Sequence, residues 1–434
     1  MSNKWKVTPL SKCLSKVIDY RGRTPKKLGH EWAQNGYKAL SANNVKFSGL
    51  DKLDSINYAD EELYQKWMKE EVKRGDLLLT SEAPSGQVML WDSDEKIVLS
   101  QRLYALRVNS KIDAAFLKYY LQSPAGQKEI FRNNSGSTVA GISAKTFENI
   151  LVRHPEEKYA QQKIGDVLYS IDKKIDCNNR INAELEKLAK EMYEYWFVQF
   201  DFPNDLGRPY KTSGGTMAWN DVLKNKIPAD WKVTQLDDLV SIVKDGAIPE
   251  AFDASTPYIG LEHIARKSIA ITSWSTADQA SSNKTAFQDG DILFGKIRPY
   301  LHKVGLAMMD GITSTDTIVM RPKSKEVLGL ALETVFSDKF IKAATHGSTG
   351  SKMPRADWSV MKNYRIATPE KGSPVLLSFQ SFFNPLVEKI RLNIKEIREL
   401  STLRDWLLPL LMNGQVTAER HDAKTHISVP AEGT

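Results

Sequence analysis

Apolar residues recur along this chain with two different periods. Short apolar runs at 76–81, 96–108 and 291–297 are bounded by turn-forming or charged residues, which is typical of strands. Two much longer stretches, 160–197 and 373–415, carry apolar residues every three or four positions, which is typical of amphipathic helices. The pattern therefore predicts a mixed α/β (α+β) fold in which strand-rich segments alternate with two long helices.

Both expected helices carry a heptad pattern on one face. The first places Ile171, Asn178, Leu185 and Met192 seven residues apart, beside Ile175, Asn182, Ala189 and Trp196. The second places Leu386, Asn393, Leu400 and Leu407 beside Ile390 and Ile397, with Arg404 interrupting the second row. A single helix on a globular core would show the same pattern, but two such helices in one chain favour packing on each other. We expect a seam formed by Ile171, Ile175, Leu185, Met192, Leu386, Ile390, Leu400 and Leu407. Asn178 and Asn182 either lower its stability and fix its register, or mark a loosely packed start of the seam.

The chain also repeats itself. Five matches recur in the same order: WKVT at 5 and 231, GDLLLT and GDILFG at 75 and 290, LRVNSK and MRPKSK at 106 and 320, GST at 136 and 347, and EL at 184 and 399. A constant order with small drifts in spacing indicates one unit that was duplicated and then changed by insertions and deletions. The copies differ most between WKVT and GD, and variable loops on a shared scaffold usually carry recognition.

The duplication sets the expected domain boundaries. They are a strand-rich domain at 1–157, a helix at 158–200, a linker at 201–230, a second strand-rich domain at 231–372, a second helix at 373–415 and a tail at 416–434. The linker is rich in Gly, Pro, Asn and Ser, so we expect it to be mostly irregular.

Composition narrows the class of protein. The 434 residues are 41% hydrophobic and 26% charged, enough for two or three domains with their own cores. We find no run of eighteen apolar residues and no secretory signal, so we expect a cytoplasmic protein without a membrane span. Cys13 and Cys177 lie far apart and support neither a disulfide framework nor a zinc site. A net charge of +7 suits a polyanionic partner, although many basic proteins bind no nucleic acid.

Catalytic motifs are missing from the sequence. Residues 290–296 fit GxxxxGK, but Ile297 stands where a phosphate-binding loop has Ser or Thr, and the first copy has no lysine there. The chain has no HExxH, no GxSxG and no pair of histidines at metal-ligand spacing. We therefore assign no catalytic residue and no metal ligand.

The longer motifs resemble the specificity (S) subunit of type I restriction-modification systems. In the first copy the resemblance rests on GDLLLTSEAPSGQVMLW, LSQRLYALR and the stretch from GSTVAGIS to MYEYWF. In the second it rests on TPYIGLEHI, GDILFGKIRPYLHKVGLA and GITSTDTIVMRPKSK, and FDFPNDLGRPYKTSGG looks like the family's spacer. The resemblance covers nearly the whole chain.

This resemblance implies a subunit that recognises double-stranded DNA and has no catalytic site of its own. Two target-recognition domains, separated by antiparallel coiled-coil helices, would each read half of a bipartite, asymmetric site. The 38 residues at 160–197 would span about 57 Å as a helix, longer than one DNA turn of about 34–36 Å. Methyltransferase (M) subunits, usually two, would dock on the helices and carry S-adenosylmethionine. Restriction (R) subunits, when present, would bring ATP and Mg, so the complex would be an adenine-N6 methyltransferase and an ATP-dependent endonuclease. None of these cofactors is expected on this chain.

Candidate DNA-binding residues are cationic or polar side chains on expected loops. The first copy offers Arg21, Arg23, Lys26, Lys27, Ser81, Glu82, Ser85, Gln87, Ser137, Thr138 and Lys145. The second offers Lys296, Arg298, Tyr300, His302, Lys303, Ser348, Thr349, Lys352 and Arg355. Each set could instead be a solvated charge run or a plain turn. We favour 296–303, where polar residues alternate with apolar ones as on a strand with one outward face.

Two other classes stay open at this point. Each copy could be a catalytic domain such as a nuclease, and activity of the chain alone, lost on a single acidic substitution, would identify that class. The chain could also be a tandem scaffold that binds only protein, and it would then not be retained on DNA.

Overall fold

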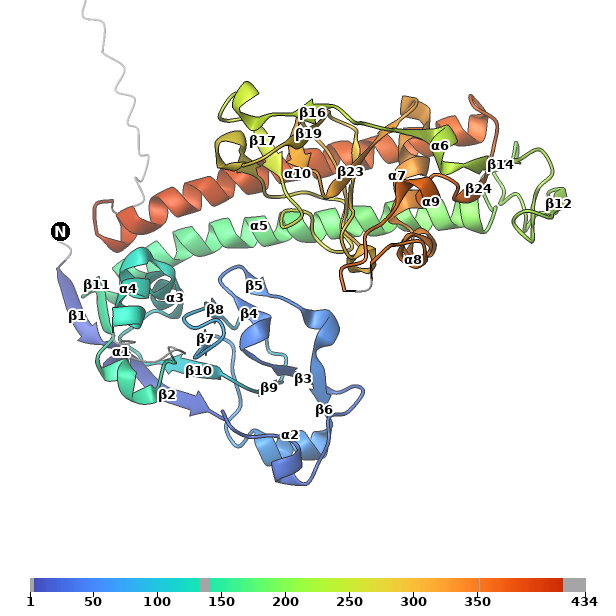
Figure 1. The fold of residues 1–434 in the computed structure, drawn as a ribbon. Helices are drawn as coiled ribbons and strands as arrows, with labels where there is room; N and C mark the ends of the chain where they lie inside the picture. The colour runs from blue at the N-terminus through green and yellow to red at the C-terminus, as the bar shows by residue number, and fades with distance from the viewer. Residues whose placement is uncertain (1–3, 133–140, 351, 417–434) are drawn as a thin grey trace, which may run out of the picture. The chain divides into compact units, whose positions relative to one another are not determined.

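The computed structural model describes residues 4–132, 141–350 and 352–416. The chain forms two compact units, one comprising the chain up to Lys174 together with the chain from Leu400, the other Ile175–Glu399. Both units contain strands, short helices and part of each long helix, α5 (Lys158–Tyr193) and α10 (Pro374–Met412) (Figure 1). The expected mixed fold with two long helices is confirmed.

A four-stranded antiparallel sheet forms the centre of the first unit. Its strand order is β2 (Leu14–Asp19), β10 (Leu103–Val108), β7 (Leu77–Thr80) and β8 (Val88–Leu90). Successive side chains of a strand point to opposite faces of the sheet, and here they enter two different cores. Leu77 and Leu79 pack with α3 (Ala114–Gln122), whereas Leu78 packs with Trp67 of α2 (Glu61–Trp67). The sheet is therefore buried on both faces.

Smaller pairings complete this unit. The first WKVT motif lies in β1 (Trp5–Pro9), which runs antiparallel to β11 (Leu151–Pro155) just before α5. A three-stranded sheet has the order β6 (Asn57–Ala59), β3 (Tyr37–Leu40) and β9 (Ile97–Leu99), with β3 and β9 parallel. The remaining elements include α1 (Leu10–Cys13), α4 (Pro124–Arg132), β4 (Val45–Lys46) and β5 (Gly49–Leu50).

The second unit repeats this topology. Its four-stranded sheet has the order β15 (Val240–Ile242), β23 (Thr317–Pro322), β20 (Ile292–Gly295) and β21 (Val304–Leu306). The second WKVT motif enters β14 (Lys232–Gln235), which runs antiparallel to β24 (Arg365–Thr368) just before α10. A five-stranded sheet, in the order β16 (Gly246–Ala247), β19 (Lys284–Phe287), β22 (Gly311–Ser314), β17 (Pro257–Ile259) and β18 (Ser275–Thr276), has β17 and β22 parallel. The duplication seen in the sequence is thus a duplication of structure.

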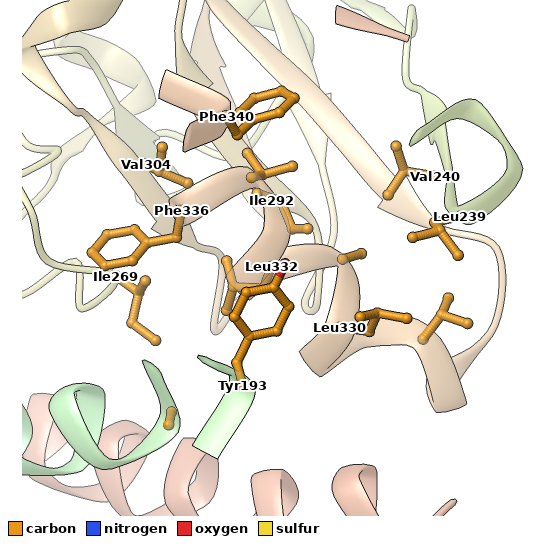
Figure 2. Close-up of a cluster of buried hydrophobic side chains, with 14 of the residues drawn as sticks. Tyr193, Leu239, Val240, Ile269, Ile292, Val304, Leu330, Leu332, Phe336 and Phe340 are labelled. Atoms are coloured by element: carbon orange, nitrogen blue, oxygen red, sulfur yellow. The ribbon is translucent and has the colours of Figure 1, made fainter. Parts of the chain in front are cut away.

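The core of the second unit joins its sheet to α5. Side chains from β20, β21, α7 (Leu328–Phe336) and α8 (Asp338–His346) form one apolar cluster. Figure 2 shows Tyr193 of α5 pointing toward Leu330 and Leu332 of α7 in this cluster. The Tyr193 hydroxyl lies 3.2 Å from Oγ1 of Thr334. An aromatic side chain of the long helix therefore belongs to the globular core.

The two long helices pair in an antiparallel sense. In the second unit, Asn178 Nδ2 donates to Glu396 Oε2 at 2.8 Å, and Asn393 Nδ2 donates to Asn182 Oδ1 at 2.7 Å. Partner numbers fall along α10 as they rise along α5. Of the expected seam residues, Ile390 is buried, and Ile171, Ile175, Leu185, Met192, Leu386, Leu400 and Leu407 are half-buried. The deepest positions of this seam include the asparagines, so its centre is polar.

The linker is mostly irregular, as expected, but it contains one hairpin. Residues 217–228 form this hairpin from β12 (Met217–Asn220) and β13 (Asn225–Pro228). Phe202 stacks on Trp231 with ring centroids 5.1 Å apart, and Tyr210 stacks on Phe202 at 4.6 Å. These contacts anchor the linker to the start of the second copy.

Candidate nucleic-acid interface

Both copies turn at the matching position after a central strand, but the two turns differ, because the peptide bond between Ala83 and Pro84 of the first copy is cis. β7 ends at Thr80 and β20 at Gly295, and three residues later Ala83 and Arg298 have φ of 48° and 50°. Each of these residues precedes a proline, and a non-glycine residue rarely adopts this left-handed conformation. Both side chains are exposed. The scaffold therefore presents one surface position twice, with alanine in the first copy and arginine in the second.

Backbone hydrogen bonds join the second corner to a distant loop. The amide of Arg298 donates to the carbonyl of Pro354 at 2.7 Å, and the amide of Ala356 donates to the carbonyl of Lys296 at 2.9 Å. Thr349 and Arg355 exchange a pair of backbone hydrogen bonds of 3.0 and 2.8 Å. The structure thus brings together two segments that the sequence separates by about fifty residues.

The side chains of this corner make it cationic. Its exposed members are Arg298, Tyr300, Thr349, Lys352, Met353 and Arg355, while Lys296 and Ser348 are half-buried. Ser348 Oγ donates to the carbonyl of Thr345 at 2.6 Å. Within the described part of the chain, no carboxylate forms an ion pair with Arg298 or Arg355. Unpaired guanidinium groups are suited to phosphates and to base edges.

His302 and Lys303 do not belong to this surface. The His302 ring is 5% exposed and donates from Nε2 to the carbonyl of Phe336 at 2.8 Å, and burial lowers its pKa. Lys303 Nζ donates to the carbonyl of Leu261, and burial likewise lowers its pKa. The expected strand over 296–303 is wrong, because β20 ends at Gly295 and a 3-10 turn follows at Pro299–Leu301.

The corner of the first copy has different chemistry. The Glu82 carboxylate lies 3.5 Å from Nε of Arg102, an arginine that no sequence motif singles out. The hydroxyls of Ser81 and Ser85 are buried without a partner among the described residues. Gln87 Oε1 accepts from the amide of Phe47 at 3.1 Å, so this side chain holds the fold. A carboxylate and a guanidinium, and not a cluster of cations, mark this corner.

The two arginines of the loop at 21–27 contact other residues of the first unit. The Arg21 guanidinium lies 3.9 Å from the Tyr104 ring centroid and donates twice to Asp19 at 2.9 Å. Arg23 lies over the Tyr20 ring at 4.4 Å. Lys26, Lys27 and Lys145 are exposed, and Lys27 Nζ donates to the carbonyl of Gly22 at 2.8 Å. The predicted residues Ser137 and Thr138 lie outside the described residues.

The described residues contain neither a metal-binding cluster nor a membrane-spanning helix. Over residues 4–132, 141–350 and 352–416, no group of His, Cys, Asp and Glu side chains could hold a metal ion. Within the same ranges no helix is long and apolar enough to cross a membrane. The duplicated scaffold thus carries unlike polar groups at the matching corners of its two copies.

Comparison with known proteins gives the family. Residues 4–187 and 228–384 match the model of the type I restriction modification DNA specificity domain, and the chain belongs to this family. It is 24% identical over 361 residues to the MjaIX specificity subunit of Methanocaldococcus jannaschii, covering 80% of this chain and 78% of that protein. It is 24% identical over 411 residues to the HindI specificity subunit of Haemophilus influenzae, covering 80% and 88%. The expected resemblance to specificity subunits, in place of catalytic subunits, is confirmed.

A solved structure shares the fold. The type I restriction-modification S subunit from M. genitalium superposes with a TM-score of 0.57 at 16% identity, covering 94% of this chain and 96% of that one. This likeness supports the duplicated mixed fold with two long helices.

Proposed function

We propose that this chain reads a bipartite, asymmetric site in double-stranded DNA for a type I restriction-modification complex. Each copy reads one half of the site. The observation that carries this proposal is the duplicated corner: one scaffold presents Glu82 and Ala83 in the first copy but Arg298 in the second. Different polar groups on the same frame select different bases.

Phosphate contacts supply much of the affinity. Lys352 and Arg355 are exposed beside Arg298, and Lys26 and Lys145 are exposed in the first unit. Cations that neutralise phosphates release counterions, so binding should weaken steeply as salt rises. The chain would act in the cytoplasm, on the DNA that its complex modifies.

The long helices set the spacing between the half-sites and dock the methyltransferase subunits. Several apolar side chains lie on helix faces that the seam leaves open: Leu188 is 41% exposed, Leu392 55%, Leu403 43% and Trp406 61%. A groove of about 500 Å³ on α5 is lined in part by Cys177, Ile181 and Leu188. Exposed apolar patches on a helix favour a protein partner. Two methyltransferase subunits, one for each copy, would bring S-adenosylmethionine, and restriction subunits would bring ATP and Mg.

The test is a selection from random-sequence duplexes. The full chain, purified with the methyltransferase subunits of its host, should enrich two short, different sequences separated by a fixed spacer. Enrichment of no sequence, or of one contiguous sequence, would refute the proposal.

A further inference from the structure

The second corner carries an inference about which base is read. We propose that Arg298 reads a guanine in the half-site of the second copy, through two hydrogen bonds from its guanidinium to O6 and N7 in the major groove. This inference rests on the proposed function and adds the chemical identity of one recognised base and the residue that selects it.

Two hydrogen bonds hold the backbone of Arg298 in place. Its amide donates to the carbonyl of Pro354 at 2.7 Å, and its own carbonyl accepts from the amide of Leu301 at 2.8 Å. Pro299, which follows, is buried. Backbone strain at a left-handed residue persists only where the surroundings hold it, and it often marks a functional position. A side chain on a fixed backbone loses less entropy on binding than one on a mobile loop.

The two copies carry different residues at the position of Arg298. Ala83 occupies the position equivalent to Arg298, with nearly the same φ and also before a proline. The scaffold therefore does not require arginine there, and nothing in the second unit uses its guanidinium as a structural ion pair among the described residues. Readers of different half-sites need different base-reading residues at the positions where the half-sites differ. A residue that only contacts phosphates is free to be the same in both.

The loop beside Arg298 carries other exposed cations. Lys352 and Arg355 are exposed on the adjoining loop, so cations for the phosphates already stand beside Arg298. Arginine pairs with the two acceptors of guanine by its planar fork, and this is the commonest specific contact of arginine with DNA. Lysine carries the same charge but has no such fork. Comparing arginine with lysine at this position therefore distinguishes recognition of the base from attraction by charge.

The experiment uses the full chain with its methyltransferase subunits and the random-duplex selection. Arg298→Lys should keep the salt dependence of binding but lose the preference for G·C at one position of one half-site, by roughly tenfold to a hundredfold. Arg298→Gly should lose the same preference, and glycine suits the positive φ, so loss of folding cannot mimic the result. The matched control Lys352→Ala should weaken all sequences alike and reduce the slope of log affinity against log salt by about 0.9.

Three outcomes are distinguishable. Loss of one G·C preference in Arg298→Lys and Arg298→Gly, with the other half-site unchanged, supports the inference. An equal loss of affinity for every sequence in Arg298→Gly, with an unchanged selected site, means that Arg298 contacts phosphate and overturns the inference while leaving the proposed function intact. A wild-type complex that selects no sequence refutes the proposed function itself.

Discussion

The carboxylate of Asp291 and the guanidinium of Arg321 form two parallel hydrogen bonds, each of 2.8 Å. Asp76 and Arg107 form the same pair in the first copy, at 2.9 and 2.8 Å. Both aspartates are 1% exposed, and each also accepts a backbone amide at 2.8 Å, from Gln288 and Lys73. The repeated GD motif therefore marks a buried bidentate ion pair that holds the turn before the central strand.

Removing one partner of this buried pair should be costly. Asp76→Asn leaves the Arg107 guanidinium without its main partner and should lower the stability of the first unit by about 3–5 kcal/mol. Hydrogen exchange of the β7 and β10 amides measures this local loss. Asp94→Asn is the matched control, because Asp94 pairs with Arg74 at the surface and its side chain is 82% exposed. Equal effects of the two substitutions would contradict the structural role of the motif.

The polar centre of the helix seam gives a second prediction. Asn393 donates to Asn182, whose own Nδ2 has no partner among the described residues. Asn393→Leu leaves the buried amide of Asn182 without this hydrogen bond and should lower stability by about 1–3 kcal/mol. The double variant Asn182→Leu with Asn393→Leu should recover much of that loss, because both polar groups are then gone. Thermal unfolding of the four members of this double-mutant cycle measures the coupling, and additive losses would argue against a paired amide.

A buried carboxyl predicts how stability depends on pH. Burial, followed by the charge of Glu186, raises the pKa of Glu333 on α7 to about 8, and burial also raises the pKa of Glu186. In the unfolded state Glu333 has the ordinary pKa of 4.5 and loses its proton above that pH, whereas in the folded state it keeps the proton up to about pH 8. The free energy of unfolding therefore falls as pH rises from about 4.5 to 8.

Glu333→Gln should remove most of this dependence. The variant should melt at a higher temperature than the wild type at pH 8, and the difference should shrink toward pH 5. Thermal melts across this range check the prediction. Glu370→Gln, at an exposed position of the same unit, is the control and should follow the wild type. A constant difference between Glu333→Gln and the wild type at all pH values would show that titration is not the cause.

If the methyltransferase subunits dock on the exposed apolar face of α5, a charged residue on that face should weaken docking. Leu188→Asp should reduce co-purification of the methyltransferase subunits without lowering the melting temperature, because Leu188 lies outside the helix seam. Leu206→Asp, at a 77% exposed linker position, should leave assembly unchanged. Loss of the complex in both variants, or in neither, would count against docking at this face.

Much of the scaffold could be predicted from local pattern. The two WKVT motifs mark the first strand of each copy, and the heptads predicted both long helices because a period near 3.5 leaves few alternatives. The short helices α3, α4, α7 and α8 were not predicted individually, since buried helices and strands of this length have similar apolar runs.

The site was harder to predict because its residues depend on distant partners. His302 looks like a surface residue in its sequence context, but Phe336 accepts its hydrogen bond from 34 positions away. Arg21 looks like a free cation, yet it stacks on Tyr104. Backbone hydrogen bonds bring the loop that carries Lys352 and Arg355 next to Arg298, and no periodic pattern in the sequence indicates this contact. Composition identifies candidate groups, and only tertiary contacts show which of them stay exposed.

The most direct measurement of the central claim is an exchange of one reader. Residues 231–372 would be replaced by the corresponding segment of another specificity subunit, and the selected DNA sequence determined for the assembled complex. The account predicts that one half of the site changes while the other half and the spacer length stay the same. A change in both halves, or in neither, would contradict independent reading by the two copies.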